Sequence, residues 1–463
     1  MRAISRTTVG VWSRLTGGNG GPSANRQIFN AAAVIAVVTI VVKLVSMGKD
    51  QTVAAWFGAG DALDCFLIAY MLPSFVINVV GGSFNAALIP TYIRVREQEG
   101  EEAAHRLLSG VLMLSAGLLL ATMLVLSLVL PELLPLLAHG FDTAKLHETQ
   151  MLFYLLVPAI VINGLATLMG AVLNAGERFV LTAFTPMTTP VAAIAALLLF
   201  GARYGIRALA VGTVLGLATE FVVLAWRLHR KGVRLRRPPA LSHAAVRQVI
   251  GQYVPMVAGA CLMSGTTLVD QAMAAMLPAG SVATLNYGNK LVALSLNVGS
   301  IALGTAILPY FSKMVANSEW AGVRHVLRTY TKLITAAAVP LVAVLCLLSE
   351  PLVRLIFQHG AFTAADTHLV AQVQQMFLLQ VPFYLLGTLN VRLISALRGN
   401  RILLYGAMIS LPVDVVANWL GMKYFGIAGI ALSTSIVYVC SYSFLSVALR
   451  RLLEAQNRCD EPG

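Results

Sequence analysis

Long apolar runs recur along the whole chain, and this feature constrains the fold more than any other. They cover residues 28–49, 62–90, 107–132, 149–174, 179–202, 207–228, 248–277, 282–312, 330–350, 366–397, 401–422 and 427–449. About 20 apolar residues suffice for a helix to cross a bilayer, so the pattern predicts about twelve transmembrane helices. Only 11% of the 463 residues are charged, against about 25% in soluble domains. These values exclude a soluble enzyme, a secreted disulfide scaffold and a disordered protein.

The basic residues prefer one side of the predicted membrane. If the amino terminus is cytoplasmic and the spans alternate, five basic residues fall on the far side: Lys145, Arg203, Arg207, Arg354 and Lys423. Four more lie inside predicted spans, and the remaining 24 of the 33 Lys and Arg lie on the cytoplasmic side. This asymmetry predicts that both termini are cytoplasmic. Since no basic stripe is interleaved with aromatic residues, the net charge of +13 does not indicate nucleic-acid binding.

The chain divides near its middle into two related halves. We expect a basic cytoplasmic tail (1–26), an N-lobe of six spans (27–230), a basic cytoplasmic linker (231–247), a C-lobe of six spans (248–452) and a cytoplasmic tail (453–463). LAHGFDTA at 137–144 recurs as FQHGAFTAAD at 357–366, and ALIPTY at 87–92 recurs as AILPYF at 306–311. The sequence therefore predicts an all-α integral membrane protein, with two pseudo-repeated six-helix lobes around a central cavity, as in transporters with parallel repeats.

Signatures of catalysis and metal binding are missing from the sequence. The five cysteines form no CxxC pair, which argues against a metal site or a disulfide framework. No H-E-x-x-H, G-x-S-x-G or P-loop motif occurs. His139 and His359 occupy equivalent positions in the repeat and are interpreted as turn residues. We expect neither enzymatic activity nor a cofactor.

Ionisable residues inside the spans are the candidate functional residues, because a charge at mid-bilayer costs at least about 2.5–3.5 kcal/mol. Lys43 lies well inside an apolar run and is predicted to face a cavity, whereas Lys49 and Asp50 also fit an interfacial position. The others are Asp64, Glu220, Asp270, Lys290, Arg392 and Asp414. An ion pair between Asp414 and Arg392 that helps the bundle to assemble is a structural alternative for those two residues.

Residues 43–75, KLVSMGKDQTVAAWFGAGDALDCFLIAYMLPSF, resemble the signature of the MurJ/MviN-type lipid II flippase family. The matching parts are FGAG, Asp64, Phe66, Ala69, Leu72 and Pro73. Two later segments resemble second-lobe motifs of the family: NYGNKL with GSIALGTAILPYFSK, at 286–313, and FQHGAFTAADT, at 357–367. The resemblance extends over residues 28–450. It implies two six-helix lobes in a V shape, alternating access, and a cationic cavity that grips the pyrophosphate of an undecaprenyl-linked sugar.

The resemblance also implies the residues of the substrate site: Lys43, Lys49, Asp64, Asn78, Asn85, Tyr287 and Lys290. Where the family has cavity arginines, this chain has lysines, which lack the planar fork that matches a phosphate. The chain also has about twelve spans where typical members have fourteen. Lipid II is the first substrate expected, and an O-antigen or exopolysaccharide repeat unit is the second. A cation-coupled multidrug exporter is the third possibility, and it predicts an aromatic cavity lined by acids.

A cation site in the second lobe is also implied, because some relatives bind sodium there through an acid, a pair of residues four apart and a hydroxyl. This chain has Asp270, Asp414, Asn418 and Thr434 in corresponding positions, with the order of Asp and Asn reversed. Their oxygens are predicted to lie within about 5 Å of one another, with sodium or a proton as the coupling ion. We expect a monomer in the bacterial inner membrane, with an undecaprenyl-pyrophosphate-linked glycan as its partner.

Overall fold

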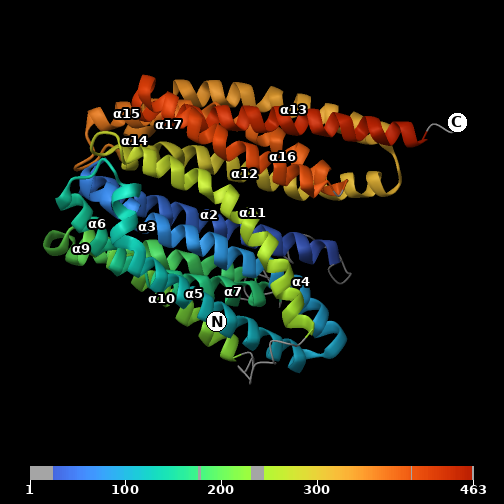
Figure 1. Cartoon of the computed structure of the whole chain (residues 1–463), viewed down its shortest axis with the longest axis horizontal. Helices are drawn as coiled ribbons and strands as arrows, with labels where there is room; N and C mark the ends of the chain where they lie inside the picture. Colours follow the sequence, from blue (N-terminus) through green and yellow to red (C-terminus); the bar gives the residue numbers. More distant parts are fainter. Residues whose placement is uncertain (1–23, 176–178, 231–243, 398, 461–463) are drawn as a thin grey trace, which may run out of the picture.

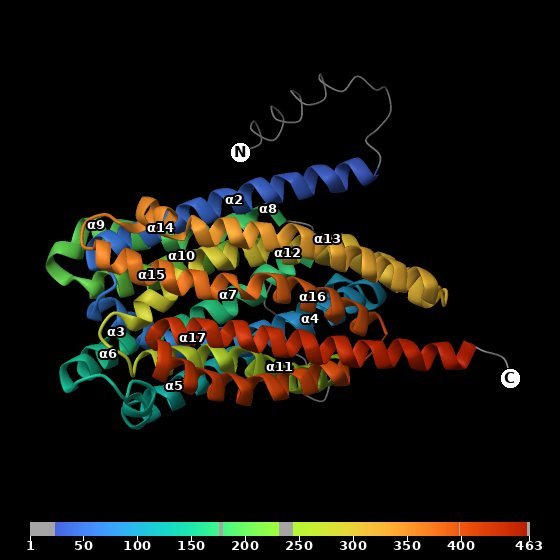
Figure 2. The same cartoon turned by 90° about the horizontal axis from the view of Figure 1, so that it is seen from above.

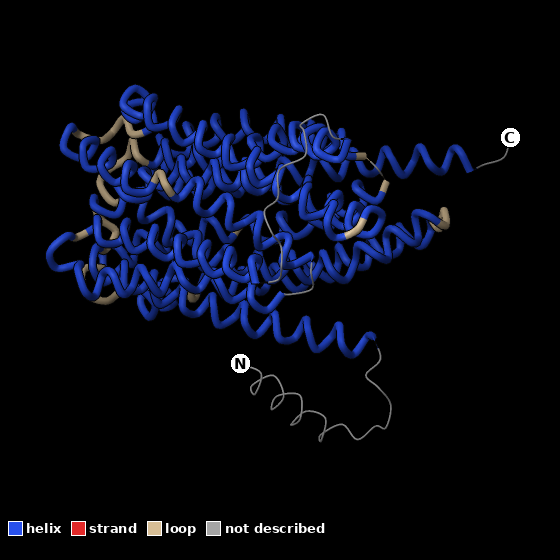
Figure 3. The backbone as a smooth tube through the Cα atoms, turned by 90° about the horizontal axis from the view of Figure 1, so that it is seen from below, coloured by secondary structure: helices blue, strands red, loops and turns tan. Residues whose placement is uncertain are grey.

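The computed structural model describes residues 24–175, 179–230, 244–397 and 399–460. Within these ranges the chain consists of helices and short connections, with no strand (Figure 3). The predicted tail (1–26) and linker (231–247) lie largely outside the described residues. By length and composition, eight helical segments of the described chain can cross a membrane. The all-helical membrane fold predicted from the sequence is therefore confirmed.

The first half of the chain forms a group of packed helices, called here the N-terminal helix group. Its members are α2 (Ala24–Phe57), α3 (Asp61–Val76), the π-helical segment η1 (Ile77–Gly81), α4 (Gly82–Glu99), α5 (Glu101–Leu137), α6 (Thr143–Leu156), α7 (Ala159–Ala175), α8 (Phe179–Phe184), the 3₁₀ segment η2 (Thr185–Met187), α9 (Thr188–Tyr204) and α10 (Ile206–Arg230). The predicted second span is thus one path through α3, η1 and α4, with a π-helical turn between the two α-helices.

The second half begins with α11 (Ala244–Ala274), which is followed by the C-terminal helix group. This group contains α12 (Ser281–Ala316), α13 (Trp320–Leu347), α14 (Ser349–Phe357), α15 (Ala364–Leu378), α16 (Gln380–Ala396) and α17 (Asn400–Asp460). The chain reverses inside α17 at Gly426, whose φ of 57° is a conformation that glycine adopts without strain. The predicted eleventh and twelfth spans are the two arms of α17. The eight apolar segments do not include α2, α11 or α12.

The two helix groups lie against each other and meet most closely at one end (Figure 1). At that end α3 contacts α12, and α14 contacts α2. Toward the other end the groups diverge, and α11 runs from its contact with α17 across to α4 (Figures 1 and 2). The largest apolar core is continuous across this meeting end, where Phe66 and Phe153 of the first group share it with Phe357 and Phe377 of the second. We call this the closed end.

Candidate functional site

A carboxylate held between two ammonium groups joins the two helix groups. Asp50, near the carboxyl end of α2, lies with Oδ1 2.8 Å from Lys49 Nζ and Oδ2 3.2 Å from Lys290 Nζ. Lys49 belongs to α2 and Lys290 to α12, so the pair of contacts crosses between the groups. Two positive charges and one negative charge leave the cluster cationic. The Lys290 side chain stays 38% exposed, so an anion from water can approach it.

Lys43 extends this cationic cluster along α2. It lies seven residues before Asp50, or two helical turns, which places both residues on one face of the helix. Its side chain is exposed, and its charge acts on Lys290. The structure thus brings Lys49 and Lys290 into direct contact with one carboxylate and sets Lys43 beside them. The sequence argument missed the role of Asp50, although its spacing of seven residues from Lys43 indicated that the two share a face of α2.

Asp64, the acid of the predicted substrate site, makes a different contact between the groups. It is buried on α3, and its two oxygens accept hydrogen bonds from Gly280 N at 2.8 Å and Ala283 N at 2.7 Å. These are amides of the first turn of α12, a helix whose own N-cap residue, Gly280, supplies no side-chain cap. A carboxylate there satisfies free amides and interacts favourably with the helix dipole. Asp64 therefore caps a helix of the opposite group.

Glycines allow backbone to meet backbone around this cap. A Cβ at Gly280, which has a φ of 83°, would overlap the carbonyl oxygen of Ala59. A Cβ at Gly360 would overlap the carbonyl of Ala55, which accepts a hydrogen bond from Ala361 N at 2.8 Å. Larger residues at either glycine would push the helix groups apart. The closed end is thus built from direct main-chain contact.

The closed end has an approximate internal symmetry. Just as Gly360 approaches Ala55, Gly140 approaches the carbonyl of Ala275. The two glycines are 220 positions apart (360 minus 140), and so are the two alanines that they approach (275 minus 55). Each glycine follows a histidine in a turn, as the sequence predicted for the repeated HG pair. The repeat therefore uses both of its copies in closing this end.

The other predicted substrate residues lie in different surroundings. Tyr287 is buried and packs against Phe357 and Phe362, with ring centroids 5.0 and 5.5 Å away. Asn78 is exposed within the π-helical segment η1, and the side chain of Asn85 lies outside the described part of the chain. Tyr287 thus has a packing role in the closed end, and contact of these three residues with a substrate stays a prediction.

The four residues of the predicted cation site meet between α11 and α17. Asn418 Nδ2 donates a hydrogen bond of 2.7 Å to Asp270 Oδ1, and the Thr434 hydroxyl, which lies on the facing arm of α17, donates to Ile430 O at 3.3 Å. Asp414 is 1% exposed, and its charge acts on Asp270. Asp414 Oδ2 and Asn418 Oδ1 are buried and lack a hydrogen-bond partner. Carboxylate, amide and hydroxyl oxygens with free lone pairs are suitable ligands for a hard cation.

The structural alternative for Asp414 has no support among the described residues. No ion pair forms between Asp414 and Arg392, and Arg392 Nε has no hydrogen-bond partner. The described chain also contains no group of three His, Cys, Asp or Glu side chains that could hold a metal ion.

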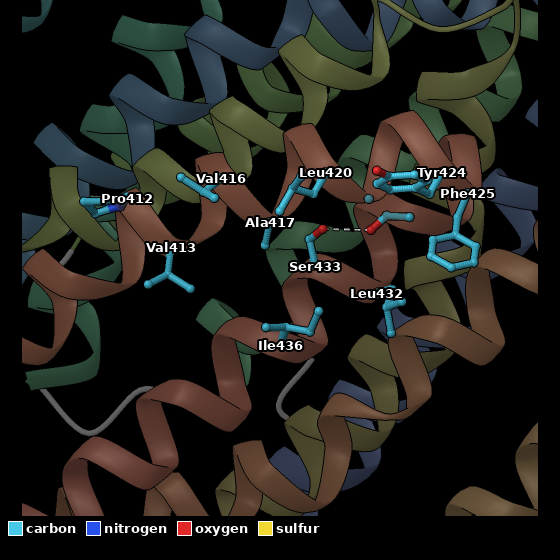
Figure 4. A pocket seen from close by; sticks show the side chains of 12 residues that line it. Pro412, Val413, Val416, Ala417, Leu420, Tyr424, Phe425, Leu432, Ser433 and Ile436 are labelled. Atoms are coloured by element: carbon cyan, nitrogen blue, oxygen red, sulfur yellow. Dashed lines mark hydrogen bonds between the residues drawn. The ribbon is translucent and has the colours of Figure 1, made fainter.

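An apolar cavity of about 540 Å³ lies between the two arms of α17 (Figure 4). Its lining includes Val413, Val416, Leu420 and Ile436, and the hydroxyl of Ser433 is occupied by a 2.8 Å hydrogen bond to Gly429 O. Hydrocarbon fits such a lining, whereas a charged head group would lose its hydration there without compensation. The cationic cluster formed by Lys43, Lys49, Asp50 and Lys290 remains the candidate site for an anion.

The fold is that of solved transporters of two related kinds. A structure described as lipid II flippase MurJ in an inward closed conformation matches with a TM-score of 0.77 at 20% identity, over 90% of this chain and 87% of that one. An inward-facing multidrug resistance MATE family transporter of the MOP superfamily matches with a TM-score of 0.76 at 13% identity, over 92% and 99%. The chain therefore has the fold that these two transporters share.

Sequence similarity identifies the family within this class. The family model for lipid II flippase MurJ matches residues 53–458. The probable lipid II flippase MurJ of Synechocystis sp. is 25% identical over 447 residues, covering 93% of this chain and 83% of the relative. The lipid II flippase MurJ of Burkholderia cenocepacia is 24% identical over 450 residues, covering 92% and 84%. The chain belongs to the lipid II flippase MurJ family.

The shared carboxylate makes a testable prediction about stability. Asp50→Asn leaves the ammonium groups of Lys49 and Lys290 close together without a counter-charge. We therefore expect the free energy of unfolding to fall by about 2 kcal/mol. Adding Lys290→Gln should recover at least half of that loss, because it removes the repulsion. Thermal unfolding of the purified protein measures both effects.

Asp61→Asn is the matched control, because Asp61 is exposed and pairs only with Lys145, at 2.8 Å. Asp61→Asn should lower the free energy of unfolding by less than about 1 kcal/mol. An Asp50→Asn variant no less stable than this control would contradict the electrostatic account. A double variant less stable than Asp50→Asn alone would contradict it as well.

Proposed function

We propose that this protein moves lipid II, an undecaprenyl-pyrophosphate-linked precursor of peptidoglycan, across the bacterial inner membrane by alternating access. The observation that carries the proposal is the cationic cluster, in which Lys49 and Lys290 reach one carboxylate from opposite helix groups. A pyrophosphate brings negative charges that can replace Asp50 as the partner of these ammonium groups. Family membership supplies the lipid-linked class of substrate.

In this proposal the helices cross the membrane twelve times, in two lobes of six. The N-lobe spans residues 27–230, the C-lobe spans 248–452, and the basic linker (231–247) joins them on the cytoplasmic side. Counting the two arms of α17 separately, together with α2, α11 and α12, supports this number of crossings. The distribution of Lys and Arg supports cytoplasmic termini. The closed end then faces away from the cytoplasm.

Alternating access requires contacts that can be broken at the closed end. Asp64 and the main-chain contacts at Gly140, Gly280 and Gly360 hold that end together. A head group bound by Lys49 and Lys290 competes for their charge with Asp50, which weakens a second link between the lobes. Substrate binding and lobe opening are coupled in this way, because a ligand shifts an equilibrium by its differential affinity for the two states.

Ion coupling is assigned to Asp270, Asp414, Asn418 and Thr434. Two nearby carboxylates repel each other unless a cation or a proton lies between them, and buried oxygens without partners are available in the cluster. We propose a monovalent cation, with sodium first and a proton as the alternative. Since α11 contacts both α17 and α4, an ion bound at its Asp270 can influence how the two lobes are linked.

Removing the positive charges should abolish flipping. We expect Lys49→Ala and Lys290→Ala to lower the initial rate at least tenfold, because each removes a charge that meets the pyrophosphate. Fluorophore-labelled lipid II in liposomes containing the purified protein is bleached by an impermeant reductant once it reaches the outer leaflet, which gives the rate. Lys145→Ala is the control, because Lys145 pairs with exposed Asp61 outside the cluster.

Unchanged flipping by the variant in which Lys43, Lys49 and Lys290 are all alanine would contradict the proposal. A labelled polysaccharide unit on the same lipid carrier tests the second substrate. If that unit moves faster than lipid II, the result would favour polysaccharide export as the function. A labelled phospholipid that moves equally fast would reject recognition of the pyrophosphate.

Sodium should stabilise the folded protein through Asp414. Sodium chloride, compared with choline chloride at equal ionic strength, is expected to raise the thermal unfolding temperature of the wild type, because a ligand of the native state stabilises it by mass action. Asp414→Asn should remove this difference, and Glu350→Gln, a change at an exposed acid, should keep it. The same sodium effect in Asp414→Asn would reject this residue as a ligand.

A further inference from the structure

An acid in the N-terminal helix group has no part in the sites described above. Glu220 lies in α10, inside one of the eight segments able to cross a membrane. It is ten residues from Arg230 at the helix end, which is about 15 Å at 1.5 Å per residue. That depth places the carboxyl group in the hydrocarbon region, where an unpaired charge is costly. Its persistence there calls for a physical explanation.

Close packing directs Glu220 toward one neighbouring segment. Gly212, Gly216 and Glu220 are spaced four residues apart and therefore share a face of α10. A Cβ at Gly212 would crowd Ala193 and Ala196, and a Cβ at Gly216 would overlap Thr189. The face of α10 that bears the two glycines is thus in contact with α9. One turn further along, Glu220 meets the segment that precedes α9.

That segment is a break in the helix. The 3₁₀ segment η2, Thr185–Met187, separates α8 from α9 and contains Pro186, which has no amide hydrogen. Threonine hydroxyls satisfy the main chain around the break: Thr188 Oγ1 donates to Thr185 O and to Gly216 O, at 2.9 Å each. Thr185 is buried, and its Oγ1 lies 3.3 Å from Glu220 Oε1. The break therefore presents a hydroxyl to the acid.

No positive charge compensates Glu220 in the described part of the chain. It forms no ion pair, and Thr185 is its hydrogen-bonding side chain. The charged groups on α10 and the elements packed against it lie elsewhere: Arg207 pairs with Glu148, Lys145 pairs with Asp61, and Asp64 caps α12. Arg203 is at the far end of α9, and Arg227 is two turns from Glu220 on α10. In hydrocarbon, a carboxyl group with one hydroxyl partner has a lower free energy as the neutral acid than as the carboxylate.

We propose that Glu220 and Thr185 form a proton-binding site in the N-terminal helix group, separate from the cation cluster between α11 and α17. A proton taken from water binds the carboxylate and makes the group neutral. The opposite step returns the proton to water and leaves a charge at the helix break. Because α2 packs against α8, η2 and α9, the charge at this break bears on the helix that carries Lys43, Lys49 and Asp50. The link to a transport cycle rests on the proposed function, whereas proton binding does not.

Infrared difference spectroscopy of the full chain in lipid tests proton binding directly. Lowering the pH should produce the carbonyl stretch of a protonated carboxyl group that disappears in Glu220→Gln. Asp414→Asn is the matched control and should retain that band. Thr185→Val should shift the band to higher frequency, because the carbonyl loses a hydrogen-bond donor, and Thr185→Ser should leave it in place.

A spectrum of Glu220→Gln identical to that of the wild type overturns the proposal, and so does a Thr185→Val variant with an unshifted band. The link to transport is tested separately by the flipping rate across the same pH range. The wild-type rate should change with pH, whereas the Glu220→Gln rate should stay constant. Parallel pH profiles would remove that link. A protein that flips no lipid II would still show the infrared titration, so the two proposals fail independently.

Discussion

One hydrogen-bonded carboxylate at the closed end holds the two halves of this protein together. Asp64 of the N-terminal helix group caps α12 of the C-terminal helix group, where the residue at the N-cap position is a glycine. A glycine is needed there because Ala59 approaches the backbone too closely for a side chain. The helix therefore depends on the other half of the chain for its cap. If the halves separate at this end, α12 loses that cap and Asp64 loses its donors.

This dependence gives alternating access an energetic basis. Hydrogen bonds to charged groups contribute about 1.5–3 kcal/mol each, and Asp64 makes two of them, so the closed arrangement has a defined cost of opening. Asp50 adds a second link between the halves, one that an anionic head group can replace. Asp64 is sequestered from anions, whereas Lys290 remains accessible to them. Asp64 thus stabilises the closed end, and Asp50 is the residue with which the substrate competes in the proposed function.

The sequence allowed the helical membrane fold to be predicted, because the length of apolar runs responds directly to bilayer thickness. It also led to the grouping of Asp270, Asp414, Asn418 and Thr434, of which Asn418 donates a hydrogen bond to Asp270, while the binding of a cation by the group stays a prediction. The motif that contains Asp64 was correctly recognised, but its contact with α12 could not be foreseen. Main-chain amides have no signature in a sequence, and a glycine N-cap does not reveal which residue replaces its missing side chain.

Asp50 and Tyr287 show two further limits. Asp50 was interpreted as a residue near the membrane interface, because a sequence does not show that Lys290 of a distant helix reaches the same carboxylate. Tyr287 was assigned to a substrate site by its motif, and the sequence did not show that its ring packs against Phe357 and Phe362. Both outcomes depend on contacts between residues at least 70 positions apart in the chain. Local pattern predicts which residues are unusual, and tertiary packing decides what they touch.

The most direct test of this account is the distance between spin labels at His139→Cys and His359→Cys, in a background without the five native cysteines. Both positions are exposed and adjoin the glycines of the closed end. In lipid without substrate, double electron–electron resonance should give a single short distance for the wild type. In Asp64→Ala a second, longer distance should appear, with a population at least ten times that found at the same distance in the wild type, because the variant lacks both hydrogen bonds to α12. Asp61→Ala should give the wild-type distribution. An unchanged distance distribution in Asp64→Ala would contradict the claim that this carboxylate holds the two halves together.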